Sequence, residues 1–163
     1  MFKKEEIENY FRLAIELAEK GRGYVFSNPL VGCVIVKDKK IIATGYHKRY
    51  GGDHAEIDAI KKVKDKNLLK NATLFVTLEP CCHYGKTPPC VNAIIENKIK
   101  EVYVGIYDPN PLVYKKGVEI LRKNGIKVKV GFLEKEIKKQ NEVYFKYIKE
   151  KEPFCDCKSC DNP

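Results

Sequence analysis

Apolar residues recur every three or four positions near the start of the chain. They are Ile7, Tyr10, Phe11, Ala14, Leu17 and Ala18. This spacing places them on one face of an α-helix, and a glycine such as Gly21 commonly follows a helix end. The pattern therefore predicts an amphipathic helix over residues 4–20.

Two short apolar runs come next, LVGCVIV at residues 30–36 and KIIATGY at residues 40–46. Runs of this length, rich in β-branched residues, are typical of β-strands. The polar residues 37–40 lie at their junction and supply a turn. We therefore expect the two strands to form a hairpin.

Helices and strands alternate over the rest of the chain. The pattern predicts helices over residues 54–63, 88–97, 114–125 and 134–149, and strands over residues 72–78, 101–107 and 126–131. Strands that alternate with helices of this length form a mostly parallel sheet covered on both faces. We expect an α/β fold with three layers, α/β/α, around a central, mixed and mostly parallel sheet of five strands.

The length of 163 residues suits one domain with its own hydrophobic core. Only the end of the chain, EPFCDCKSCDNP, changes character. We therefore expect a single domain over residues 1–150, followed by a flexible, cysteine-containing tail over residues 151–163. Cys155, Cys157 and Cys160 of this tail could bind a metal, but three cysteines without a fourth ligand make a poor closed site.

The formal charge of +9 raises the question of nucleic-acid binding. Only four of the 31 basic residues are arginines, the side chain that base readout and phosphate contacts favour. The lysines are scattered along polar segments. We therefore expect a solvated lysine-rich surface and no nucleic-acid partner, although such a field would attract a phosphorylated small substrate.

The cysteines point to metal chemistry or catalysis. The chain has no apolar run of about 18 residues, and acidic residues interrupt the N-terminus where a signal peptide would be apolar. We therefore expect a cytoplasmic protein without a membrane segment. In that setting seven cysteines favour metal binding or catalysis over disulfides.

Three of the candidate ligands, His54, Cys81 and Cys90, come at predicted element ends. His54 opens a helix and Cys81 follows a strand, while Thr87 as a cap and Pro88 at the first helical position would put Cys90 in a first turn. A helix N-terminus stabilises a thiolate. One histidine and two cysteines suit a catalytic Zn²⁺ whose fourth position is left for water.

Two alternatives remain open at this point. Glu56 stands three residues after Asp53, so the pair could form a capping box, or Glu56 could carry protons at the metal. Cys82 could act as a fourth ligand, which would make the chain a non-catalytic zinc-binding module. Cys33 lies within an apolar strand and is expected in the core.

The motif His54-Ala55-Glu56, combined with Pro80-Cys81 and a later cysteine, resembles the zinc-dependent nucleoside and nucleobase deaminases. Their signature has two residues between the cysteines, whereas this chain has eight. Together, five motifs resemble the deaminase half of the bifunctional riboflavin-biosynthesis deaminase/reductase family over about residues 8–150. They are SNPLVG (27–32), GYH (45–47), GGDHAE (51–56), TLEPCCHYGKTPPC (77–90) and DPNPLV (108–113).

The resemblance implies hydrolytic deamination of 2,5-diamino-6-ribosylamino-4(3H)-pyrimidinone 5′-phosphate, with Glu56 moving the protons. It also implies a substrate pocket lined by Asn28, His47, His83, Lys86, Thr87, Asp108 and Asn110. Lys86 and His47 are the candidates for the phosphate, and the long loop between the cysteines would enclose a mononucleotide. A tRNA or nucleoside deaminase is the nearest alternative, but it would need an open groove and the short cysteine spacing.

In the bifunctional family the stretch that corresponds to FKYIKEKEPF leads into a reductase domain. Here the sequence reads CDCKSCDNP after it. We therefore expect a deaminase that passes its product to a separate reductase. Family members are often oligomeric, so a homo-oligomer is expected as well.

Overall fold

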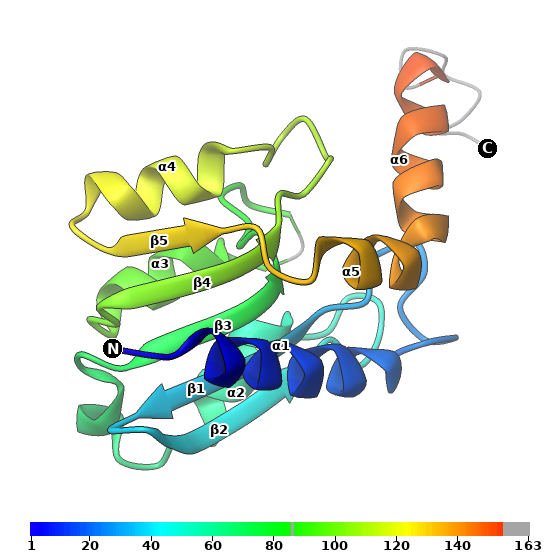
Figure 1. Cartoon of the computed structure of the whole chain (residues 1–163). Coiled ribbons are helices and arrows are strands. Elements are labelled where there is room, and N and C mark those ends of the chain that lie inside the picture. Colours follow the sequence, from blue (N-terminus) through cyan, green and yellow to red (C-terminus); the bar gives the residue numbers. More distant parts are fainter. Residues whose placement is uncertain (86, 155–163) are drawn as a thin grey trace.

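The computed structural model of the protein describes residues 1–85 and 87–154. Its centre is a five-stranded sheet in the order β2-β1-β3-β4-β5 (Figure 1). The strands are β1 (Gly32–Lys37), β2 (Lys40–Tyr46), β3 (Thr73–Leu78), β4 (Glu101–Ile106) and β5 (Lys127–Val130). β1 runs antiparallel to β2 and β3, while β3, β4 and β5 are parallel. Four strands thus share one direction, which confirms the predicted mixed sheet.

Helices cover both faces of the sheet and give the predicted three layers (Figure 1). One face carries α1 (Lys4–Glu19) and α5 (Glu134–Gln140). The other carries α2 (Ala55–Lys62), α3 (Cys90–Glu96) and α4 (Lys116–Lys123), and a short 3₁₀ helix, η1 (Lys66–Leu69), precedes β3.

The three central strands β1, β3 and β4 are largely apolar because both of their faces are buried. Along β1, Val34 and Val36 pack with α1, whereas Cys33 and Ile35 belong to the cluster under α2, α3 and α4. In β3, Phe75 also packs on the α1 side of the sheet, where its ring stacks on the ring of Tyr103. This alternation is the period of two of a β-strand. It explains why the sequence shows continuous apolar runs, and Cys33 is in the core as expected.

The predicted helix over residues 134–149 is in fact two helices, α5 and α6 (Glu142–Phe154), that meet at Asn141. The side chain of Asn141 is only 2% exposed. Its Oδ1 accepts a hydrogen bond from the Leu30 N–H at 2.7 Å, and its Nδ2 donates to the Leu30 carbonyl at 3.0 Å. This long-range pairing fixes the junction, and α6 stands out from the body beyond it (Figure 1). α6 extends to Phe154, beyond the predicted tail boundary at residue 151, and Cys155, Cys157 and Cys160 lie outside the described residues.

The start of α3 also differs from the prediction. The helix begins at Cys90, its N-cap is Pro89, and no side chain of the cap residue binds the helix. The predicted cap at Thr87 with Pro88 at the first helical position is therefore wrong. The first amides are satisfied instead by Cys81, whose Sγ accepts from the Cys90 N–H and whose carbonyl accepts from the next amide, both at 3.2 Å. A tertiary contact thus replaces the local cap.

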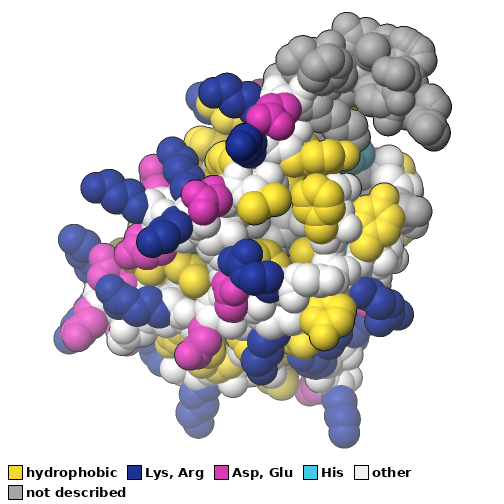
Figure 2. Space-filling view, turned by 90° about the vertical axis from the view of Figure 1, so that its right-hand side faces the viewer, with side chains coloured by type: hydrophobic (Ala, Val, Ile, Leu, Met, Phe, Trp, Pro, Cys, Tyr) yellow, Lys and Arg dark blue, Asp and Glu magenta, His cyan; other side chains and the backbone are white. Residues whose placement is uncertain are grey.

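On the face shown in Figure 2, Lys and Arg side chains are interspersed with Asp and Glu, and apolar side chains gather toward α6. Among the described residues, no helix combines the length and the apolar character that crossing a membrane requires.

Candidate active site

A cavity of about 300 Å³ opens at one edge of the sheet. It lies where β2, β3 and β4 end and where α2 begins, so side chains distant in sequence meet there. The carboxyl ends of parallel strands are the usual place for a ligand in an open α/β sheet. Its lining includes His54, Glu56, Glu79 and Cys81.

The structure brings the three predicted metal ligands together. His54 Nδ1 lies 3.5 Å from Cys81 Sγ and 3.3 Å from Cys90 Sγ, and the three ligand atoms lie within 4.8 Å of one another. A tetrahedral ion with Zn–N and Zn–S bonds of about 2.0–2.3 Å holds its ligand atoms about 3.3–3.8 Å apart. The two nitrogen–sulfur distances match this spacing, so the group is arranged as a zinc site requires.

The electrostatics of the cluster favour a cation as well. The hydrogen bond with Cys90 is the main cause that lowers the pKa of Cys81 to about 4, and the hydrogen bond with His54 adds to it. The same hydrogen bond to Cys81, together with burial, raises the pKa of Cys90 well above its ordinary value. The hydrogen bond with Cys81 also raises the pKa of His54. Without a cation only one thiol of the pair ionises readily, and a divalent cation would stabilise both thiolates.

Glu56 sits beside this cluster in the first turn of α2. It is 3% exposed, and burial, with the charge of Cys81 as a second cause, raises its pKa to about 7. The N-cap of α2 is His54, and Asp53 instead pairs with Lys61 at 2.8 Å. The capping box with Asp53 is therefore not formed, and the Glu56 carboxyl contacts both its own backbone amide and the Cys90 thiol of the ligand group.

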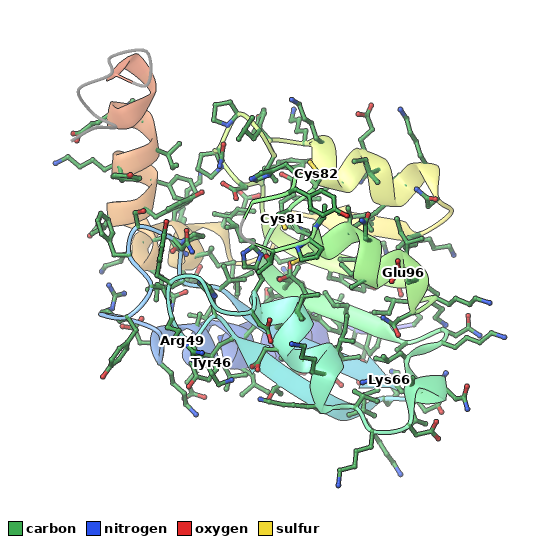
Figure 3. The ribbon with its side chains drawn as sticks, turned by 180° about the vertical axis from the view of Figure 1, so that it is seen from behind. Tyr46, Arg49, Lys66, Cys81, Cys82 and Glu96 are labelled. Carbon is green, nitrogen blue, oxygen red and sulfur yellow. The ribbon has the colours of Figure 1, made fainter. Side chains whose placement is uncertain are left out.

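Cys82 is separate from the ligand group. It lies beside Cys81 on the side of the loop that leads into α4 (Figure 3), and its thiol donates to the Leu112 carbonyl at 3.5 Å. Among the described residues the candidate metal group holds His54, Cys81 and Cys90 alone. The closed four-ligand site considered from the sequence is not formed, and a three-ligand site keeps a position open for water.

His47 and Asn28 form one hydrogen-bonded unit in the cavity wall. His47 Nδ1 lies 2.8 Å from the Asp53 carbonyl, and its Nε2 lies 3.1 Å from Asn28 Nδ2. A carbonyl can only accept, so Nδ1 carries the proton and Nε2 accepts from the Asn28 amide. Burial lowers the pKa of His47, which favours this neutral form. Because both ring nitrogens are used, the arrangement argues against the predicted phosphate contact and points to His47 orienting Asn28.

The family of the chain follows from comparison with known proteins. The model of the cytidine and deoxycytidylate deaminase zinc-binding region matches residues 4–106. A diaminohydroxyphosphoribosylamino-pyrimidine deaminase of Buchnera aphidicola (subsp. Schizaphis graminum) is 49% identical over 140 residues, which are 86% of this chain and 94% of that protein. The chain belongs to this deaminase family. Zinc is accordingly the metal for which its histidine and cysteine donors are suited.

Larger relatives match the deaminase equally well. The riboflavin biosynthesis protein RibD of Aquifex aeolicus is 49% identical over 155 residues, 95% of this chain and 43% of that protein. A crystal structure of a deaminase/reductase from Thermotoga maritima superposes with a TM-score of 0.86 at 50% identity, covering 91% of this chain and 42% of that one. The chain thus spans about two fifths of the length of these two relatives.

Six of the seven predicted substrate residues line the same cavity. They are Asn28, His47, His83, Thr87, Asp108 and Asn110. Lys86 lies outside the described residues. His83 Nδ1 is buried without a hydrogen-bond partner among the described residues, so a ligand could satisfy it.

Glu79 and Tyr144 are among the cavity residues that sequence reasoning missed. Glu79 accepts hydrogen bonds from the backbone amides of Asp108, Lys115 and Val118 at 3.0–3.2 Å, so it is a structural carboxylate that fixes the loop before α4. Tyr144 enters the cavity wall from α6. The position of Glu79 between a buried strand and Cys81 was a usable signal, but nothing in the sequence indicated where Tyr144 would dock.

Proposed function

We propose that this deaminase hydrolyses 2,5-diamino-6-ribosylamino-4(3H)-pyrimidinone 5′-phosphate to 5-amino-6-ribosylaminouracil 5′-phosphate and ammonia. The observation that carries the proposal is a buried carboxyl, Glu56, held beside a three-ligand metal group within a cavity. The substrate class is supported by the similarity to the Buchnera aphidicola deaminase, which extends over nearly all of that protein.

The residues divide the chemistry among them. His54, Cys81 and Cys90 would hold the zinc ion, which supplies a water of lowered pKa that can attack a ring carbon at neutral pH. Two thiolates offset the charge of the ion, so the water is less acidic than beside three imidazoles. A carboxylate base next to it compensates for part of that loss.

Glu56 is the proton carrier in this proposal. The attacking water gives a proton to Glu56 as its oxygen bonds to the amino-bearing ring carbon, and Glu56 passes that proton to the ring nitrogen. Glu56 then takes the second proton of the former water from the new hydroxyl and delivers it to the amine, so that the C–N bond breaks, ammonia leaves and a carbonyl remains. Burial raises the pKa of Glu56, and a raised pKa is the direction that suits a carboxyl that must both accept and donate a proton.

The cavity wall supplies the contacts to the rest of the substrate. Asn28, oriented by His47, offers an amide, and His83 offers a ring nitrogen that has no partner among the described residues. Asp108 can accept a hydrogen bond from a substrate hydroxyl or amine. We keep Lys86 as the predicted phosphate partner on the strength of its place in the sequence.

Ammonia release from three substrates tests the proposal. The zinc-loaded protein is incubated with the diaminopyrimidine ribotide, with cytidine and with tRNA. We expect ammonia from the ribotide only. Release from cytidine or tRNA at a higher kcat/KM would replace the proposed substrate, and no release from any of them would support a binding module.

The product is a uracil ribotide that still carries its ribosyl ring. The Thermotoga maritima relative is named as a deaminase and a 5-amino-6-(5-phosphoribosylamino)uracil reductase. We propose that the product of this chain is likewise consumed by a reductase. Homo-oligomer formation remains a prediction.

A further inference from the structure

Helix α6, at the end of the described chain, contributes to the cavity although it lies outside the matched deaminase region, residues 4–106. Tyr144, in the first turn of α6, lines the cavity and is 7% exposed. Its hydroxyl donates a hydrogen bond to Asp108 Oδ1 at 3.0 Å. α6 rises beside the loops at this end of the sheet (Figure 1).

Within the described residues, the side-chain carboxylate of Asp108 accepts all of its hydrogen bonds on one oxygen. Oδ1 also accepts from the Asn110 N–H at 2.9 Å, and within the described residues Oδ2 accepts no hydrogen bond. Two donors on one oxygen fix the rotation of a carboxylate, so the direction of Oδ2 is set before a ligand arrives. Oδ2 is the atom left to accept a hydrogen bond from the substrate.

The junction before α6 is itself anchored to the opposite wall. The Asn141 side chain binds both the N–H and the carbonyl of Leu30, at 2.7 and 3.0 Å. Leu30 lies two residues after Asn28, the amide that His47 orients. One short segment, residues 141–144, therefore touches the loop of Asn28 and the side chain of Asp108.

We propose that Tyr144 is a positioning residue for Asp108, and that the Asn141 junction aligns the Asp108 and Asn28 sides of the pocket. The inference rests on the proposed function, since Asp108 and Asn28 act there on the substrate. Its physical basis is pre-organisation: a carboxylate already held in its bound orientation loses less rotational freedom on binding. A substrate contact remote from the reacting carbon stabilises ground and transition states alike, so its loss appears mainly in KM.

A double-mutant cycle in steady-state kinetics on the ribotide tests the role of Tyr144. Tyr144→Phe keeps the ring and removes only the hydroxyl, and we expect it to raise KM roughly tenfold with little change in kcat, as for the loss of one hydrogen bond to a charged group. Asp108→Asn should raise KM at least as much. The double variant should match Asp108→Asn within about twofold, because Tyr144 acts through Asp108.

Tyr147→Phe is the matched control. Tyr147 lies one turn along α6, packs edge-on against Phe26 and is not part of the cavity lining. We expect its KM to equal that of the wild type. A similar rise in both Tyr→Phe variants would show a general loosening of α6 and would overturn the positioning role.

Three other results would also overturn the inference. They are an unchanged KM in Tyr144→Phe, effects that multiply in the double variant, and loss of zinc or of the folding transition in Tyr144→Phe, which would make the residue structural. A different result refutes the proposed function: the wild type releases no ammonia from the ribotide. That result would refute this inference as well. A wild type that turns over the ribotide while Tyr144→Phe is unaffected refutes the inference alone.

Discussion

Glu56→Gln should separate catalysis from stability in this deaminase. The change removes the carboxylate and keeps the shape of the side chain. Loss of a general acid–base group typically costs about 10²–10⁴-fold in rate. The other carboxyls of the cavity cannot replace it, because Glu79 binds three backbone amides and Asp108 is held by Tyr144. We therefore expect a fall in kcat of about 10³-fold or more.

The same change should stabilise the zinc-free protein above neutral pH. Burial raises the pKa of Glu56 from 4.5 to about 7. The pKa is higher in the folded state than in the unfolded state, so ionisation of Glu56 opposes folding. The cost is absent well below pH 4.5, grows as pH rises to about 7, and is then constant. At about 1.4 kcal/mol per pH unit, its upper limit is about 3 kcal/mol.

Urea unfolding in EDTA measures this cost, because bound zinc would lower the pKa of Glu56 through its charge. At pH 8 the Gln variant should be more stable than the wild type by up to about 3 kcal/mol, and at pH 5 by less than about 1 kcal/mol. Zinc content before chelation should be one ion per chain in both proteins. The reasoning is refuted if the variant is less stable at pH 8, fails to retain zinc, or keeps more than about a tenth of the activity.

The remaining predictions concern the metal and the loops that hold it. Cys81→Ser should lose zinc by elemental analysis while Cys82→Ser keeps it, and equal loss in both would contradict the ligand assignment. Glu79→Gln should lower the free energy of unfolding by about 2 kcal/mol, because an amide NH₂ then faces backbone donors; an unchanged urea midpoint would remove its structural role. Gly117→Ala should cost about 1–3 kcal/mol, since a Cβ there would lie 2.1 Å from the Pro80 carbonyl oxygen, and a variant of wild-type stability would show that α4 can shift freely.

The layers of the fold could be predicted from the sequence because their signal is local. Apolar runs of strand length and apolar residues at helical spacing need no knowledge of distant partners. The metal group could be predicted for a related reason: His54 and Cys81 stand at element ends, and in an α/β sheet those ends meet at one edge. Glu56 remained ambiguous because its spacing from Asp53 fits a capping box equally well. The structure decides between the two, because the N-cap of α2 is His54 and Asp53 pairs with Lys61.

The break between α5 and α6 could not be predicted because its cause lies 111 residues away. Asn141 comes four residues after Ile137 and four before Phe145, on the apolar face of the predicted helix. Nothing local shows that a polar side chain there ends the helix. The partner of Asn141 is the backbone of Leu30. The residues around Leu30 give no sign that the sheet leaves its N–H and carbonyl without a partner. The position of Tyr144 in the cavity depends on this break, so it could not be predicted from the sequence either.

The segment Glu79–Cys81 explains how the site tolerates eight residues between its cysteines. Cys81 binds the first amides of α3 through its sulfur and its carbonyl, so Cys90 is placed by Cys81 directly and not by the path of the intervening loop. Glu79 does the same for α4 by accepting from the amides of Lys115 and Val118. The residues after β3 thus bind the first amides of two helices. The length of the loop between the cysteines can therefore vary with the substrate without displacing the zinc ligands. A change of loop length should therefore alter which substrates are accepted before it alters zinc binding.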